Sequence, residues 1–120
     1  MTAGALVVLA STAIVLGMPW WQARRELAHG VELVTAGRYQ AAARTLVRAV
    51  AARPGDARAH YYLGLAYSRL GLRDGARHQL ADAARLAGDD PIGTLARQAL
   101  TAVAQTDTGA VQDDSERSVR

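Results

Sequence analysis

Residues 57–90, with the sequence ARAHYYLGLAYSRLGLRDGARHQLADAARLAGDD, contain the pattern that decides the fold. The pattern occurs twice, because residues 23–56 can be laid over this stretch at an offset of about 34 residues. The identical positions are Ala23/Ala57, Arg24/Arg58, Gly30/Gly64, Gly37/Gly71, Ala42/Ala76, Leu46/Leu80, Ala49/Ala83 and Asp56/Asp90. A fixed period of this length indicates stacked copies of one supersecondary unit.

Glycine, proline and aspartate divide each copy into two helices. Gly37 and Gly71 stand where a residue in the left-handed conformation ends a helix. Asp56 and Asp90 suit the N-cap position, and Pro91 suits the first position of a helix. The sequence therefore predicts an all-α protein of antiparallel helices joined by short turns. The predicted helices lie near residues 22–35, 38–52, 56–70, 73–87 and 91–104.

The composition fits closely packed helices and excludes several classes of function. Half of the 120 residues are apolar, but there is neither phenylalanine nor cysteine. A core of small aliphatic residues suits helices better than a β-sandwich. The absence of cysteine excludes disulfides, zinc ribbons and thiol nucleophiles. The net charge of +3 comes without a basic run, so we expect no nucleic-acid partner.

The chain contains no recognisable pattern of catalytic or metal-binding residues. His29, His60 and His78 are the only histidines, and no two of them have the spacing of a ligand pair. The glycines are isolated and form no phosphate-binding loop. We therefore expect a protein that is not an enzyme and that holds no metal or cofactor.

An uncharged apolar run precedes the first copy. The run TAGALVVLASTAIVLGMPWW, which ends at Trp21, is long enough for a helix of about 30 Å, the thickness of a bilayer core. Trp20 and Trp21 stand where interfacial aromatic residues occur, and Arg24 and Arg25 can reach lipid head groups. We predict a transmembrane anchor over residues 1–21, with these four side chains at the membrane interface.

Two other interpretations of the apolar run remain open. A cleaved signal peptide would begin with basic residues, which are absent here, and cleavage after Gly17 would use a poor site. A buried core helix would find little room in a domain of this size.

The expected location is a bacterial inner membrane, crossed once. All fourteen basic residues are arginine, and the GC-rich codons of Arg, Ala and Gly favour a bacterial genome. Arg24 and Arg25 follow the anchor, which favours a cytoplasmic domain. Single N-terminal anchors often export the domain behind them, so the periplasmic side also remains open.

The two copies resemble the tetratricopeptide repeat (TPR), whose period is about 34 residues. The matching residues are Leu63, Gly64, Tyr67, Ala76, Leu80 and Ala83 in the second copy, and Gly30, Leu33, Ala42, Leu46, Ala49 and Pro54 in the first. The departures are Glu26 and His60 at positions that are usually bulky and apolar, His29 in place of Leu, and Gly88 in place of Pro.

The resemblance implies a short right-handed α-solenoid with TPR-like repeats at residues 22–56 and 57–90. Residues 91–105 lack the repeat signature but have one apolar stripe, which indicates a capping helix. Residues 106–120 are polar and show no periodicity, so we expect a disordered tail there.

Proteins of this family present the inner faces of their first helices as a peptide-binding groove. Here that face is apolar and aromatic with arginine at its rim, which suits an apolar segment of a partner protein. The candidate partner-binding residues are Leu27, Val31, Val34, Arg58, Tyr61, Tyr62, Leu65 and Arg69, with Leu95 and Ala99 from the capping helix. Tyr61 and Tyr62 could equally be packing residues against the capping or anchor helix. The family's carboxylate clamp of paired Asn and Lys is not expected, because the chain has neither residue.

These features lead to two hypotheses of function. The first is a non-catalytic, membrane-anchored scaffold or assembly subunit that joins other protein subunits of a bacterial membrane complex. The second is a soluble periplasmic TPR module that is released after signal cleavage. Both have protein partners, the first also contacts the lipid bilayer, and homo-oligomerisation is left open.

Overall fold

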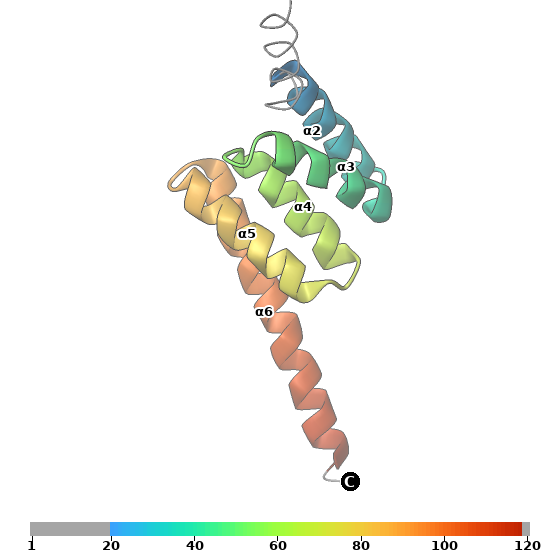
Figure 1. The fold of residues 1–120 in the computed structure, drawn as a ribbon. Coiled ribbons are helices and arrows are strands. Elements are labelled where there is room, and N and C mark those ends of the chain that lie inside the picture. The colour runs from blue at the N-terminus through green and yellow to red at the C-terminus, as the bar shows by residue number, and fades with distance from the viewer. Residues whose placement is uncertain (1–19, 119–120) are drawn as a thin grey trace, which may run out of the picture.

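The described part of the chain is entirely α-helical. The computed structural model describes the backbone of residues 20–118 and the side chains of residues 20–106. Its helices are α2 (Trp20–Thr35), α3 (Tyr39–Ala52), α4 (Ala57–Arg69), α5 (Arg73–Ala87) and α6 (Pro91–Ser118) (Figure 1). Four of these five helices begin and end within two residues of the predicted bounds, and the all-α class is confirmed for this part of the chain.

The helices form two helix-turn-helix units and a longer final helix. Figure 1 shows α2 antiparallel to α3, and α4 antiparallel to α5. The two units contact each other through α3 and α4, and also through α2 and α4. The first half of α6 lies against α5 and contacts α4. The first helices of the two units, α2 and α4, are therefore neighbours, as the repeat pattern predicts.

Each unit turns from its first to its second helix in the same way. Gly37 and Gly71 have φ values of 76° and 77°, which only glycine adopts at low cost. The backbone N–H of Arg38 donates to Leu33 over 2.9 Å, and that of Leu72 donates to Tyr67 over 2.9 Å. These are the hydrogen bonds of a Schellman motif. The predicted glycine stops are thus confirmed in both units.

Small residues bring the two helices of each unit into close contact. A Cβ atom added to Gly64 would lie 2.6 Å from Cγ of Leu80, and a Cβ added to Gly30 would overlap Leu46 in the same way. The largest side chains that are fully buried are Leu46, Leu63 and Leu80. The glycine and the leucine at matching positions of the repeat are therefore one packing pair, used once in each unit.

The start of α4 is fixed by a cap and by a buried histidine. The side chain of Asp56 accepts a hydrogen bond of 3.1 Å from the backbone N–H of Arg58, as expected for an N-cap. His60 is only 6% exposed, and its Nε2 lies 2.7 Å from the carbonyl oxygen of Pro54. Its Nδ1 lies 2.8 Å from the side-chain amide of Gln79 on α5. The ring therefore joins the loop before α4 to the second helix of the same unit.

The C-terminal tail differs from the prediction. We expected a capping helix over 91–105 and disorder over 106–120, but α6 continues without a break to Ser118. Figure 1 shows this second half of α6 extending beyond the other helices. The difference arises because extending a packed helix adds a hydrogen bond for each residue, whereas starting one is costly. Residues 106–118 have no apolar stripe that would pack on another helix, but a polar sequence does not by itself end a helix.

The predicted anchor lies largely outside the described residues. Trp20 and Trp21, placed at the end of the anchor by the prediction, form the first turn of α2. Within the residues that the structure describes, no helix has the length and apolar character needed to cross a bilayer. The anchor over residues 1–21 thus stays a prediction.

Candidate functional site

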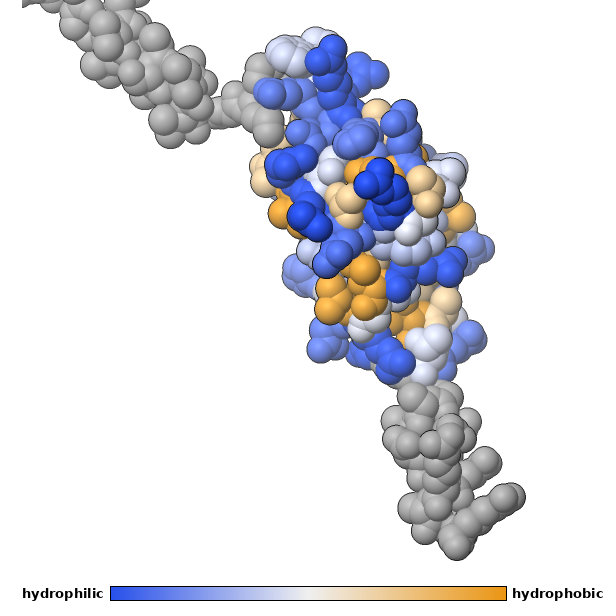
Figure 2. Space-filling model, turned by 90° about the vertical axis from the view of Figure 1, so that its right-hand side faces the viewer, coloured by the Kyte–Doolittle hydropathy of each residue, from blue (hydrophilic) through white to orange (hydrophobic). Residues whose placement is uncertain are grey.

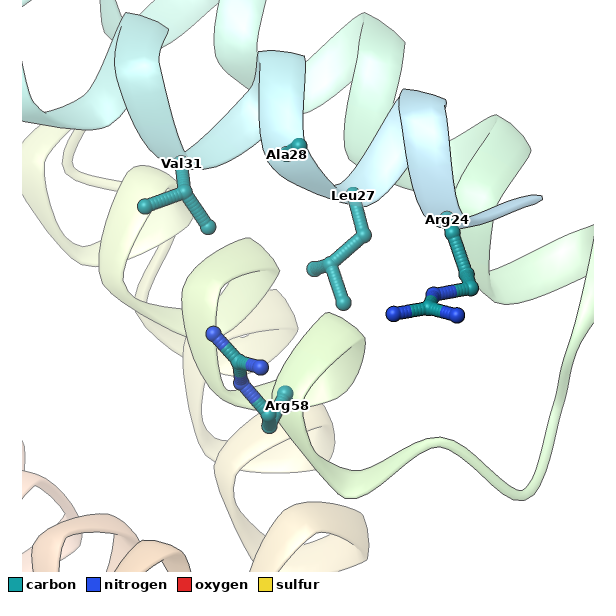
Figure 3. Close-up of a pocket in the computed structure, with 5 residues that line it drawn as sticks. All are labelled: Arg24, Leu27, Ala28, Val31 and Arg58. Atoms are coloured by element: carbon teal, nitrogen blue, oxygen red, sulfur yellow. The ribbon is translucent and has the colours of Figure 1, made fainter. Parts of the chain in front are cut away.

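A groove opens between α2 and α4, on the face where the first helices of the two units meet. It encloses about 340 Å³ and is lined by Arg24, Leu27, Ala28, Val31 and Arg58. Figure 3 shows Leu27 and Val31 pointing from α2 toward the start of α4, while Arg58 rises from α4 toward them. We call this site the α2–α4 groove.

The helical period accounts for the lining residues. Arg24, Leu27, Ala28 and Val31 are three or four residues apart and share one face of α2. Arg58 is the second residue of α4, and it occupies the same position of the second repeat as Arg24 does of the first. Two equivalent arginines from two helices therefore flank one apolar floor.

Neither of the two rim arginines, Arg24 and Arg58, is neutralised by an ion pair among the described residues. The carboxylate of Asp56, which is close in sequence, already caps α4 by accepting from the backbone N–H of Arg58. The guanidinium group of Arg24 lies 5.9 Å from the ring centroid of Trp20, a cation–π distance. The rim of the groove is consequently a pair of cations without an anion from the described part of the chain.

The two tyrosines beside the groove have a substantial packing role. The rings of Tyr61 and Tyr62 are 5.2 Å apart at 70°, an edge-to-face arrangement. Tyr62 packs against the core cluster formed by residues of α2, α3 and α4. Tyr61 packs against a second cluster, which joins Ala76 and Leu80 of α5 to Val103 of α6. Burial, and secondarily the neighbouring Tyr62, raises the pKa of the Tyr61 phenol above its usual value of 10.0. Both rings are half-buried, so only part of each is available to a partner.

The other candidate residues are more scattered than the prediction implies. Val34 is half-buried against the core cluster of α2, α3 and α4, and Leu65 is half-buried on α4. Arg69 is exposed in the last turn of α4. On α6, Leu95 is exposed and Ala99 packs beside the second core cluster. None of these residues lines the α2–α4 groove.

Of the predicted partner-binding residues, the groove brings together Leu27, Val31 and Arg58. It adds Arg24, which the sequence had assigned to the membrane interface, and Ala28, which no sequence argument had selected. The signal for Arg24 was present in its match to Arg58 at the repeat offset. Ala28 gives no such signal. Its small side chain contributes to the groove by leaving space above the helix, which the sequence alone does not show.

The remaining predicted interface residues form two stacked pairs at the start of α2. Trp20 and Trp21 are both exposed, and the guanidinium group of Arg25 lies 5.5 Å from the ring centroid of Trp21. Each tryptophan is thus covered by the arginine one turn later, which lets the pair carry an apolar face and a positive charge together. Their contact with a bilayer stays a prediction.

No arrangement of side chains in the described residues suggests catalysis. No three histidine, cysteine or acidic side chains among them lie close enough to hold a metal ion. His60 has both ring nitrogens within hydrogen-bond distance of protein groups, and His29 and His78 are exposed beside Glu32 and Asp82. The histidines therefore have structural or surface roles in this fold.

Stacked helix-turn-helix units with a groove between their first helices define a helical-repeat protein. Residues 27–91 match the model of the tetratricopeptide repeat family, which is more than half of the chain. The chain belongs to this family. Tetratricopeptide repeats suggest a protein–protein interaction module, the family is typically non-catalytic, and no catalytic family was found. No curated protein and no solved structure gives a significant match.

Proposed function

We propose that the protein is a non-catalytic, membrane-anchored scaffold or assembly subunit of a bacterial inner-membrane complex. In this proposal the two repeats form a short right-handed solenoid, the first half of α6 caps its open end, and the α2–α4 groove holds a segment of another subunit. Residues 1–21 keep the module at the membrane. In this proposal residues 1–21 contact the bilayer, and the repeats contact the protein partner through the groove.

The observation that carries this proposal is the chemistry of the α2–α4 groove. Its floor is made of Leu27, Ala28 and Val31, and its rim holds the guanidinium groups of Arg24 and Arg58. A guanidinium group binds a carboxylate through two parallel hydrogen bonds, and an apolar floor favours an apolar side chain. A partner segment with a large apolar residue close to a carboxylate fits both features.

Substitution of the two arginines tests the groove. We expect the double variant Arg24→Gln/Arg58→Gln to recover about tenfold less partner than the natural chain when the tagged full-length protein is purified in mild detergent. The matched control is Arg53→Gln, which changes an exposed arginine outside the groove. Equal recovery of every copurified protein by the double variant, with the helical circular dichroism unchanged, would remove the groove from the proposal.

The anchor is supported by the uncharged run that ends at Trp21 and by the tryptophan–arginine pairs that follow it. Intact mass of the protein from native membranes separates this proposal from the released periplasmic module. The anchored form retains the whole run and resists alkaline extraction, whereas a mass that lacks residues 1–17 would favour the released form. A reporter fused to the C-terminus then determines the side of the membrane, where the flanking arginines favour the cytoplasm.

A further inference from the structure

A second hollow lies at the other end of α4. It encloses about 560 Å³ between α3 and the turn that joins α4 to α5. Its lining residues are Gln40, Ala43, Arg44, Val47, Arg48, Tyr67, Leu70 and Leu72. We call it the turn-end pit. Arg58 of the α2–α4 groove is in the first turn of α4, and Leu70 directly follows its last turn, so the two sites are about 18 Å apart along the helix.

The turn-end pit exposes large aliphatic side chains that no described segment covers. Val47 is 45% exposed, Leu70 is 39% exposed and Leu72 is 53% exposed. Leu70 and Leu72 flank Gly71, whose left-handed conformation is required by the turn. An apolar residue at the position of Leu72 often packs on the last turn of the preceding helix, yet about half of Leu72 stays exposed. Contiguous exposed apolar side chains in a hollow mark an interaction site more often than scattered ones do.

Positive charge surrounds these side chains. Arg44 and Arg48 line the pit, and Arg48 also pairs with Glu26 over 3.3 Å. A neighbouring hollow shares Gln40, Arg44 and Leu70 with the pit and adds Arg38, while another shares Leu72 and is lined by Arg73, Asp74 and Arg77. Asp74 is the single acidic residue lining the three hollows. Figure 2 views the side toward which the two glycine turns point in Figure 1, and there orange apolar patches lie between blue polar ones.

We propose that the turn-end pit binds an acidic, amphipathic segment of a second partner protein. One or two large apolar side chains of that segment enter the pit between Val47 and Leu72. Its carboxylates lie over the arginine rim. The protein then holds two different segments at once, one at each end of α4, and acts as a bridge between them.

Two other occupants fit the observations less well. A second copy of this chain related by a two-fold axis would place one arginine-rich surface on another, and like charges at short distance repel. An anionic bilayer is best met by side chains that protrude, whereas Val47 and Leu72 line a hollow. The exposed Trp20 and Trp21 also lie at the opposite end of α2 from Gly37, which places the predicted membrane contact away from the pit.

Labelled peptides of defined chemistry test the proposal on the full-length chain in mild nonionic detergent. The first peptide is a helix of about 16 residues with leucine at i, i+3, i+4 and i+7 and glutamate on its flanks. The second replaces every glutamate by glutamine, and the third replaces every leucine by serine. Fluorescence polarisation measures the binding of each peptide to the natural chain and to its variants.

We expect the acidic leucine peptide to bind at least about fivefold more tightly than either of the other two peptides. Leu72→Ser and Arg44→Gln should each weaken it by a similar factor, and Val47→Ser on α3 provides a second apolar variant. The matched controls are Leu95→Ser, an exposed leucine on α6, and Arg53→Gln. Both controls should bind as the natural chain does. Because the acidic leucine peptide also suits the chemistry of the α2–α4 groove, Leu72→Ser is also measured in the Arg24→Gln/Arg58→Gln chain, where it should still weaken the remaining binding.

Several results would overturn the proposal. Equal binding of the glutamine peptide would show that the rim does not select acidic residues, and equal losses in the controls would show that binding is not in the pit. Dimerisation that is lost in Leu72→Ser would make the pit an interface between copies of this chain. Slower hydrogen exchange of the α4–α5 turn in phosphatidylcholine nanodiscs only when phosphatidylglycerol is added would make it a lipid surface. If the groove variants recovered as much partner as the natural chain, the groove proposal would fail. The pit proposal would still be decided by its own variants, since the two sites share no lining residue.

Discussion

Gly64 sets the distance between the two helices of the second unit. An added Cβ would lie 2.6 Å from Cγ and 2.8 Å from Cδ2 of Leu80, and 3.3 Å from its backbone nitrogen. Leu80 is fully buried, so its side chain has no free space into which it can move. The glycine is thus required by packing rather than by its backbone conformation, which is helical.

We expect Gly64→Ala to lower the free energy of unfolding by about 1–2 kcal/mol, because overpacking outweighs the gain in helix propensity. Urea unfolding followed by circular dichroism measures the change. The matched control is Gly55→Ala, because an added Cβ there meets no atom within 4 Å. A Gly64→Ala protein that is as stable as the natural chain would show that α4 and α5 are not held at this distance.

His60 is the second residue whose role only the structure reveals. The sequence placed it where the family usually has a bulky apolar residue, which accounts for its burial but not for its hydrogen bonds. The carbonyl of Pro54 accepts only, so Nε2 donates to it, and a neutral ring then has Nδ1 as an acceptor. The side-chain amide of Gln79 on α5 lies within hydrogen-bond distance of Nδ1, so both ring nitrogens have a protein partner.

We expect His60→Leu to cost about 1–3 kcal/mol of folding free energy, because the Pro54 carbonyl and the Gln79 amide lose their partner. Thermal unfolding of His60→Leu is compared with that of His29→Leu, which changes an exposed histidine. The control should stay within about 0.5 kcal/mol of the natural chain. If both variants unfold together with the natural chain, the histidine is a replaceable filler.

At the scale of the helices, the repeat pattern predicts most of what the structure contains. The positions of Gly37, Asp56, Gly71 and Pro91 predict the turns closely, because each of these residues has a local conformational reason to be there. The predicted end of α6 was too early, because no glycine or proline stop marks where this helix ends. The close approach of α6 to the end of α5 at Gly93, where an added Cβ would overlap the carbonyl of Gly88, was also not predicted.

Removal of α6 tests how far the second unit depends on it. Val103 is buried in one cluster with Ala76 and Leu80, and Ala96 on the same helix is fully buried. We expect a chain that ends after residue 90 to lose about 3–5 kcal/mol and its cooperative unfolding, because these contacts are replaced by water. A chain that ends after residue 106 keeps them and should melt as the full chain does. Equal cooperativity of the two truncated chains would contradict this account of α6.

At the scale of the whole molecule, the candidate site was only partly predictable. Helical phase selects a face, and so it found Leu27, Val31 and Arg58. It does not show how far neighbouring helices cover that face, and so it also selected Val34, Leu65 and Arg69, which the groove does not include. The partial burial of Tyr61 against α6 depends on a contact between distant segments, which no local pattern contains.

Both hollows also depend on how the two units are placed against each other. The α2–α4 groove needs the first helices of the two repeats side by side, and the turn-end pit needs α3 beside the α4–α5 turn. A single unit would contain neither. Both candidate sites therefore lie at the junction of the two repeats, although each repeat by itself is small.

The most direct test is photo-crosslinking from the groove in living cells. A photoreactive amino acid replaces Ala28, which is exposed in the α2–α4 groove, and in a matched chain it replaces Ala81, which is exposed on α5. We predict that position 28 forms one dominant protein adduct, that position 81 does not, and that Arg24→Gln/Arg58→Gln abolishes the adduct. Absence of an adduct at position 28, or the same adducts from both positions, would contradict a partner-binding role for the groove.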